Sequence, residues 1–296
     1  MPDAFWRFAA TLSMTAAAVL APATALADPP STSECTTTLS PAENADIARL
    51  SDTSTLDDED ELARLQDAVA REHRITEIFE RHADRRGTFA SGLDTVEGAA
   101  VMPLQSDPRS FADPEYAHRI SFDLLRRFLD NVHAEFSGGT PEPHWAHYFA
   151  LAADCSASPA RVALAGYDAH LVVDLPRAVA EAGSTPANAG DYFKIVANIA
   201  ETGDLITDRT DRTYNAKMGP LWRFYFFGEG LDRVLGRGVA TKPLLVASDL
   251  GANVTIFANG LALENPALTQ VTAAEIELEH QTAEHAFDIV AQLDGI

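Results

Sequence analysis

The spacing of apolar residues along the chain predicts helices and gives little sign of strands. Apolar positions recur every three or four residues over long stretches, which is the period of an amphipathic helix. The clearest stretches are residues 58–85, 113–136, 191–202 and 272–293. Alternation of apolar and polar residues, typical of a half-buried strand, never lasts more than a few residues. The pattern predicts an all-α fold, a single multi-helix domain of about eight helices over residues 58–296.

Two helix starts carry a strong local signal. Asp113 and Ser158 are capping residues, and each is followed directly by a proline, Pro114 and Pro159. A capping side chain before a proline is typical of the first turn of a helix. Ser158 opens a central helix, which we expect to be kinked or broken at Pro176 because proline lacks the backbone N–H.

The remaining segments are less regular. Residues 28–57 are rich in Ser, Thr, Pro and Asp and predict a disordered or loosely ordered linker. Residues 87–110 and 203–213 read as loops. Residues 214–235 are aromatic and interrupted by Gly and Pro, which predicts a kinked, buried helix. Residues 243–263 are apolar, but their polar interruptions argue against a membrane span.

The first 27 residues resemble a secretory signal peptide. Arg7 supplies a positive charge, residues 8–20 are apolar or small, and Ala25-Leu26-Ala27 has the small-x-small pattern of a cleavage site. The alternative is an N-terminal membrane anchor, for which the apolar stretch is short. We expect export, either secreted or periplasmic, after cleavage near Ala27, with no integral membrane span in the mature chain.

The charge and the cysteines narrow the choice of partners and compartment. The formal net charge is −22, so the surface repels nucleic acid, and no nucleic-acid partner is expected. The two cysteines, Cys35 and Cys155, predict a disulfide in an exported chain, and two unpaired thiols are the alternative.

The strongest chemical signal is the pair His170 and Asp174 on the central helix. Residues four apart lie on one face of an α-helix, about one turn from each other. Such a pair could bind a divalent metal, or the carboxylate could orient the histidine as a general base. It could equally be a buried hydrogen-bonded pair that fixes helix packing. The spacing alone leaves these three interpretations open.

Other histidines could complete a metal site. His280 and Glu284 repeat the same spacing on the last predicted helix, where His280 falls on the apolar seam. His144 and His147 lie three apart at the start of a short helix. The candidate metal ligands are therefore His118, His144, His147, His170, Asp174, His280 and Glu284. Histidine and carboxylate ligands suit zinc or another divalent metal.

Aromatic residues near these positions suggest a ligand cavity. Trp145, Tyr167, Trp222 and Tyr225 could line an apolar cavity for a small-molecule or lipid-like ligand. Aromatic residues of this kind are also common in cores, so core packing is the alternative.

The central segment resembles an uncharacterised family, the domain of unknown function 5995. The family's hallmark is a Gly-x-Asn-Ala-His-Ile-x-x-Asp-Leu-Pro helix preceded by a Trp and Phe segment. The corresponding residues are Gly166, Ala169, His170, Asp174, Leu175 and Pro176, with Trp145 and Phe149 upstream. Asp168 replaces the family's Asn, and Leu171 replaces its Ile. The resemblance covers about residues 110–240, implies a predominantly helical domain, and implies no reaction.

Two classes of function are consistent with these observations. The first is an exported metal-dependent or His/Asp acid-base hydrolase of a small or lipid-like substrate, by analogy with helical zinc phospholipases C and single-strand nucleases. The second is a non-catalytic exported binding or structural protein with an aromatic-lined apolar cavity. No Gly-x-Ser-x-Gly motif is present, so the sequence does not support a serine-hydrolase relay.

Overall fold

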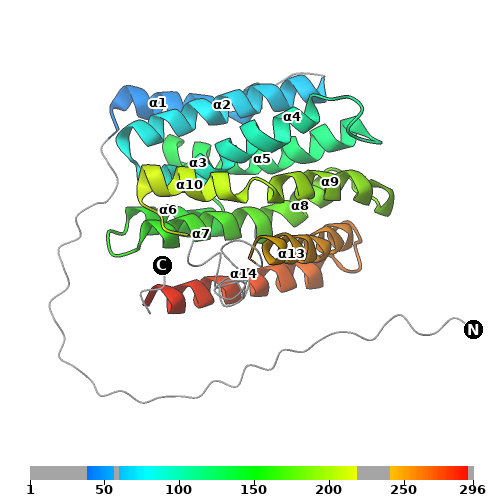
Figure 1. Ribbon diagram of the computed structural model, residues 1–296. Helices are drawn as coiled ribbons and strands as arrows, with labels where there is room; N and C mark the ends of the chain where they lie inside the picture. The colour runs from blue at the N-terminus through cyan, green and yellow to red at the C-terminus, as the bar shows by residue number, and fades with distance from the viewer. Residues whose placement is uncertain (1–38, 57–59, 219–240, 293–296) are drawn as a thin grey trace, which may run out of the picture. The chain divides into compact units, whose positions relative to one another are not determined.

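A computed structural model describes residues 39–56, 60–218 and 241–292, and the side chains of residues 241–251 are not part of that description (Figure 1). Every regular element in these ranges is helical, and no strand occurs among them. The described residues all belong to one compact unit. The prediction of a single all-α domain is therefore confirmed.

The structure has long α-helices joined by short turns and two π-helical segments. In chain order the main elements are α1 (Pro41–Leu50), α2 (Glu61–His82), α3 (Thr88–Val96), π-helix η3 (Glu97–Val101), α4 (Met102–Gln105), α5 (Pro114–Ser137), α6 (Pro143–Ala153), α7 (Pro159–Asp168), π-helix η4 (Ala169–Asp174), α8 (Leu175–Glu181), α9 (Ala189–Ala200), α10 (Gly203–Tyr214), α13 (Thr241–Leu263) and α14 (Thr269–Gln292). Short 3-10 turns lie at residues 53–55, 85–87 and 186–188.

The two predicted caps are confirmed. The side chain of Asp113 accepts a hydrogen bond from the backbone N–H of Tyr116 at 3.1 Å, and α5 begins at Pro114. The side chain of Ser158 accepts one from the backbone N–H of Arg161 at 3.0 Å. Each bond satisfies a helix-end donor that has no partner within the helix.

The predicted linker over residues 28–57 is wrong for its second half. Residues 41–50 form α1, which starts with a capping box between Ser40 and Glu43. Ile47 and Leu50 are buried in the main core cluster. The segment is mostly polar, so its composition resembles a linker. The capping box stabilises the start of the helix, and the two buried apolar residues hold the helix against the core. Residues 28–38 lie outside the described residues.

The two predicted loops are also helical. Residues 88–105 form α3, η3 and α4, with Phe89, Leu93 and Val96 buried. Residues 203–214 form α10, whose buried positions Ile206, Thr210 and Tyr214 are spaced by four residues on one face. Both segments also contain many charged and small residues around these few apolar positions. The overall composition therefore resembles that of a loop, although the apolar positions keep a helical spacing.

The central helix is not broken at Pro176. The chain stays helical from Pro159 to Glu181, and the distortion lies in the π-helix η4, just before the proline. Pro176 sits in the first turn of α8, where its missing N–H does the least harm, and the wider π-turn absorbs the change of register. Both His170 and Asp174 lie on η4.

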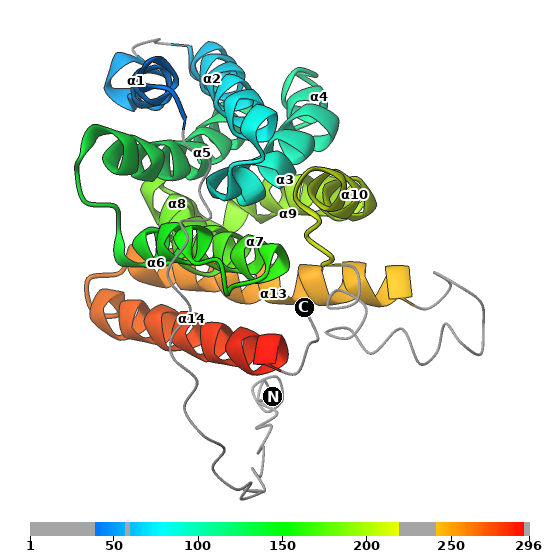
Figure 2. The same cartoon turned by 90° about the vertical axis from the view of Figure 1, so that its left-hand side faces the viewer.

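The central helix lies between two sets of helices (Figure 1 and Figure 2). On one side it contacts α3 and α5, and on the other α13 packs on α8 while α14 packs on α7. Gly260 of α13 makes the close approach to α8 possible, because a Cβ there would lie 2.9 Å from the carbonyl oxygen of Pro176. The central helix is therefore held on both sides.

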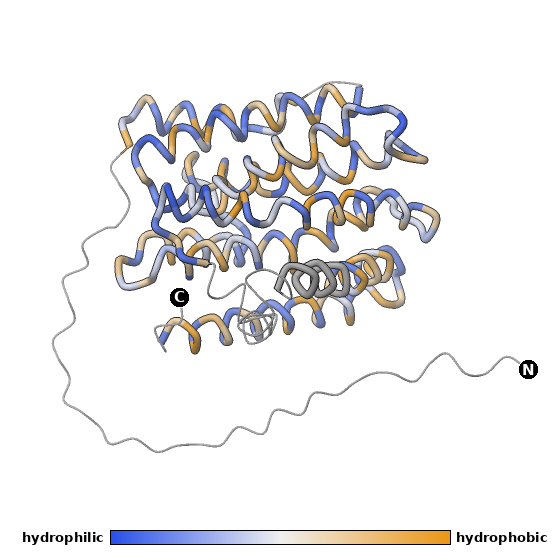
Figure 3. Tube along the Cα trace, in the orientation of Figure 1, coloured by the Kyte–Doolittle hydropathy of each residue, from blue (hydrophilic) through white to orange (hydrophobic). Residues whose placement is uncertain are grey.

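Polar and apolar residues are interleaved along most helices (Figure 3). Within the described ranges, no helix combines the length and the apolarity needed to cross a bilayer.

Candidate metal centre

Two groups of ionisable side chains lie where α6, α14 and η4 meet. The first group is Glu142, His144 and Asp174, and the second group is Asp168, His280 and Glu284. In each group, one potential ligand atom from every residue lies within 4.8 Å of the others. The rings of His144 and His280 stand nearly perpendicular, with centroids 6.3 Å apart, so the two groups adjoin.

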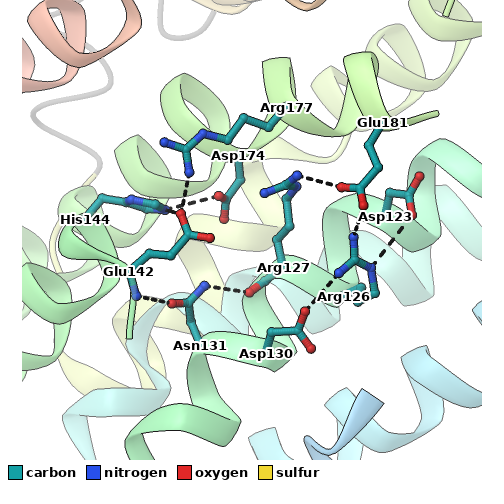
Figure 4. A network of polar contacts seen from close by, with 10 residues as sticks. All are labelled: Asp123, Arg126, Arg127, Asp130, Asn131, Glu142, His144, Asp174, Arg177 and Glu181. Atoms are coloured by element: carbon teal, nitrogen blue, oxygen red, sulfur yellow. Dashed lines mark hydrogen bonds and ion pairs between the residues drawn. The ribbon is translucent and has the colours of Figure 1, made fainter. Parts of the chain in front are cut away.

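In the first group, one ring nitrogen faces two carboxylates. Nε2 of His144 lies 3.1 Å from Oδ1 of Asp174 and 3.8 Å from Oε2 of Glu142 (Figure 4). The other oxygen of Asp174 accepts a hydrogen bond from Nε1 of Trp145 at 2.7 Å. His144 and Asp174 are buried, whereas the Glu142 side chain is 42% exposed. The first group is therefore open to solvent on the side of Glu142.

Three residues in or next to the first group come from the start of α6. Glu142 is the N-cap residue, Pro143 begins the helix, and His144 and Trp145 follow in its first turn. The backbone N–H of Glu142 donates to Oδ1 of Asn131 on α5 at 2.6 Å, which fixes the entry of the chain. The short helix thus presents an imidazole and an indole N–H to the same carboxylate on η4.

One arginine contacts the exposed side of the first group, and two others hold the neighbouring helix α8. Arg177 of α8 pairs with Glu142, and Figure 4 shows the two side chains meeting beside His144. Arg126 and Arg127 of α5 both pair with Glu181 of α8, at 2.7 and 2.6 Å. These pairs hold α8 against α5 and so fix the position of η4.

The second group is built around an oriented histidine. Nδ1 of His280 on α14 hydrogen-bonds Oδ2 of Asp168 at the end of α7. Burial alone would lower the pKa of His280, but the hydrogen bond and negative charge of Asp168 outweigh burial and raise it. A carboxylate on one ring nitrogen fixes the tautomer and orientation of an imidazole.

Glu284 is held through one oxygen only. Its Oε2 accepts from Nε2 of His147 at 2.7 Å and from the guanidinium of Arg161, which also pairs with Asp288 at 2.8 Å. Burial would raise the pKa of Glu284, but these donors outweigh burial and lower it. The second oxygen, Oε1, is buried without a hydrogen-bond partner.

His170 joins neither group, and the predicted pairing of His170 with Asp174 is replaced by other contacts. The His170 ring packs on Phe89, with centroids 5.0 Å apart, and its Nδ1 is buried without a hydrogen-bond partner. Burial lowers the pKa of His170 to about 4, despite the opposing charge of Asp174, so the ring is neutral at neutral pH. Asp174 instead binds His144 and Trp145.

Two other predicted metal ligands, His118 and His147, belong to neither group. His118 hydrogen-bonds the backbone carbonyl of Gln105 at 3.1 Å and belongs to neither group. His147 supports Glu284 without belonging to the second group.

Two of the four residues predicted to line an aromatic cavity, Trp145 and Tyr167, lie in the described part of the chain, and both pack on other aromatic side chains. Trp145 is fully buried between Phe89 and Phe128, at centroid distances of 5.3 and 5.1 Å. Tyr167 also packs on Phe89, at 5.2 Å. Trp145 is therefore a core residue, and Tyr167 is a partly buried residue that packs against the core, since aromatic rings pack favourably at such distances.

Several predictions fall outside the described residues. Trp222 and Tyr225 lie there, as do the signal peptide and Cys35. The disulfide to Cys155 therefore stays a prediction.

A cavity of about 400 Å³ lies among α2, α3 and α10, and it is lined in part by His73, Asp94 and Arg209. Asp94 bridges the other two, at 2.9 Å from His73 and 2.6 Å from Arg209. None of the predicted site residues that the structure describes lines this cavity.

Sequence reasoning missed two members of the centre, Glu142 and Asp168. Each stands two residues before a predicted histidine, His144 and His170 respectively. Residues two apart do not share a helix face, so helical periodicity gives no reason to link them. Asp168 reaches a histidine from another helix, and Glu142 reaches His144 because it sits at the helix cap.

The comparisons with known proteins identify a family. A family model described as a family of unknown function, DUF5995, matches residues 65–238. This is more than half of the chain, so the chain belongs to that family, and the match begins earlier than the resemblance predicted. No curated protein and no solved structure matches the chain.

Proposed function

We propose that this member of the DUF5995 family binds a divalent cation at Glu142, His144 and Asp174 and uses it to hydrolyse a small or lipid-like substrate. The observation that carries the proposal is the placement of two carboxylate oxygens around Nε2 of His144, at 3.1 and 3.8 Å. Ligands about 2.1 Å from a tetrahedral zinc ion lie about 3.4 Å from one another. The two distances lie on either side of that value.

The residues around the first group support the same role. Trp145 holds the outer oxygen of Asp174, and Arg177 bonds Oε2 of Glu142, the same oxygen that faces His144. Metal ligands commonly carry such outer hydrogen-bond partners, which orient them before the ion arrives. The half-exposed Glu142 marks the side from which water and substrate reach the ion.

The chemistry follows from three protein ligands and an open position. A zinc ion held by Glu142, His144 and Asp174 would supply Lewis-acid chemistry, lowering the pKa of water to about 7 and polarising a carbonyl or phosphoryl oxygen. The chain's own part is to hold the ion, orient the ligands through Trp145 and Arg177, and restrict access to the side of Glu142.

We also propose that the protein is exported and carries a Cys35–Cys155 disulfide. The support comes from the charged start, apolar stretch and small-residue cleavage pattern of residues 1–27, together with the even cysteine count. N-terminal sequencing and a thiol assay on protein recovered from the native host test both statements.

The metal proposal is tested on the full chain after chelator treatment and reloading with Zn²⁺ or Mn²⁺. Bound metal is counted by mass spectrometry, and turnover is measured on a panel of nitrophenyl carboxylic and phosphate esters. His144→Gln is expected to lower the number of bound ions by one and to abolish turnover. His118→Gln is the matched control and should change neither.

Two results would overturn parts of this proposal. The metal site is contradicted if the folded wild-type chain binds neither Zn²⁺ nor Mn²⁺. It is also contradicted if the His144→Gln variant binds as many ions as the wild type. Binding without turnover on any ester of the panel contradicts the hydrolase and favours a binding protein.

A further inference from the structure

The second group contains a buried carboxylate oxygen with no partner. Glu284 is only 8% exposed, and its Oε1 makes no hydrogen bond to any residue that the structure describes. Leaving a charged acceptor unsatisfied in the interior is unfavourable, because the group loses its hydrogen bonds to water without replacing them. In an ordinary buried ion-pair network both oxygens would be expected to have donors.

The donors around Glu284 hold it in one orientation. His147 from α6 and Arg161 from α7 both bond Oε2. Because two donors from two helices fix that oxygen, the carboxylate cannot turn to share them. The arrangement matches a carboxylate ligand whose outer oxygen is oriented by neighbours while the inner one binds a metal.

Asp168 and His280 supply the other two atoms. One ligand atom from each of Asp168, His280 and Glu284 lies within 4.8 Å of the others, and all three residues are buried. Arg161 provides a fixed positive charge, but it is shared with the exposed Asp288. Two buried carboxylates and one imidazole thus form a donor set that suits a divalent ion.

We propose that the second group binds a second divalent cation through Asp168, His280 and Glu284. This inference deepens the proposed function, because the contact between the His144 and His280 rings makes the two groups neighbouring positions of one centre. The chain then carries two ions, one at the half-exposed first group and one at the more enclosed second group.

The experiment counts ions in the chelator-stripped full chain by Zn²⁺ titration calorimetry and by metal analysis after gel filtration. Wild type is expected to bind two ions. Glu284→Gln and Asp168→Asn are each expected to weaken one of them by at least about 10-fold. Glu275→Gln, on the exposed side of α14, is the matched control and should keep both.

The variants separate the two proposals. His144→Gln should remove the first ion and keep the second. Glu284→Gln should weaken the second ion by at least about 10-fold and keep the first, and the double variant should show both losses. A wild type with one ion that only His144→Gln removes would overturn the second site alone. Asp168→Asn preserves the acceptor for His280, so it guards against loss of binding through misfolding, which circular dichroism checks.

Discussion

Glu97 offers a sharp test of the electrostatics of the interior. It lies on the π-helix η3, is buried, and its Oε2 has no hydrogen-bond partner. Burial, assisted by the negative charge of Asp94, raises the pKa of Glu97 to about 8. In the folded chain the carboxyl therefore keeps its proton at neutral pH, whereas in the unfolded chain it ionises above about 4.5.

The sign and size of the effect follow from that difference. Between about pH 4.5 and 8 only the unfolded state releases the proton, so the free energy of unfolding falls as pH rises and then levels off. At about 1.4 kcal/mol per pH unit, the range from 4.5 to about 8 corresponds to on the order of 5 kcal/mol. Gln stays neutral in both states, so Glu97→Gln is expected to remove this fall.

The assay is urea denaturation of wild type and variant at pH 5, 6, 7 and 8. The stability gained by Glu97→Gln should grow with pH by up to about 1.4 kcal/mol per unit. Glu72 is also fully buried, and its pKa is raised by burial first and by the charges of Asp94 and Glu97 in addition, so it contributes equally to both proteins only at a pH where Glu97 is protonated. Glu77→Gln, an exposed change on α2, should track the wild type. Parallel curves for wild type and Glu97→Gln would refute the reasoning, because they would mean that Glu97 is already ionised in the folded protein.

Three further predictions use the same measurements. Trp145→Phe is expected to lower the free energy of unfolding by about 1–3 kcal/mol, since Asp174 loses its buried indole donor, and an unchanged urea midpoint would contradict this. Gly166→Ala is expected to lower the free energy of unfolding by about 1–3 kcal/mol, because the new Cβ would lie 2.5 Å from Cβ of Phe89. A thermal melt tests this prediction, and an unchanged Tm would show that α3 and α7 separate freely. In the wild type, the His170 ring protonates near pH 6.5 in the unfolded chain but only near pH 4 in the folded chain, so the free energy of unfolding falls as pH drops from 6.5 to 4. His170→Gln is expected to make this fall smaller. Urea denaturation at pH 4.5 and 7 tests the prediction, and equal losses in both proteins would refute it.

Local signals in the sequence predicted the helices that carry them. The starts of α5 and α7 were predictable because a capping side chain and a proline act within one turn. α1 and α10 were missed because their stability comes from two or three apolar residues inserted into a core that composition does not reveal. In such helices tertiary packing, rather than propensity, decides the structure.

The residue types of the centre were predictable, but their partners were not. His144, Asp174, His280 and Glu284 were all candidates, and the structure brings them into two adjoining groups. The predicted link from His170 to Asp174 assumed α-helical spacing, and the π-turn of η4 changes that register. The actual partners come from other helices, so no spacing along the chain could pair them.

The apolar core and the polar centre share one short helix. Trp145 of α6 packs its ring in the core and donates its N–H to Asp174, while Tyr148, one turn on, bonds the backbone of Arg86 at 2.7 Å. The core therefore fixes the angle at which α6 presents His144 to η4 and His147 to α14. This is the rigid support that a metal site needs for its ligands.

The proposed metal centre accounts for features that a purely structural role does not require. Replacing buried ion pairs by well-packed apolar residues is often neutral or stabilising by about 1–4 kcal/mol, so such pairs contribute little to stability by themselves. Here Asp174, Asp168 and Glu284 are all buried, and Oε1 of Glu284 has no hydrogen-bond partner among the described residues. Packing alone would be better served by apolar side chains at these positions. The arrangement makes physical sense if cations complete it, with one ion beside His144 and a second between His280 and Glu284.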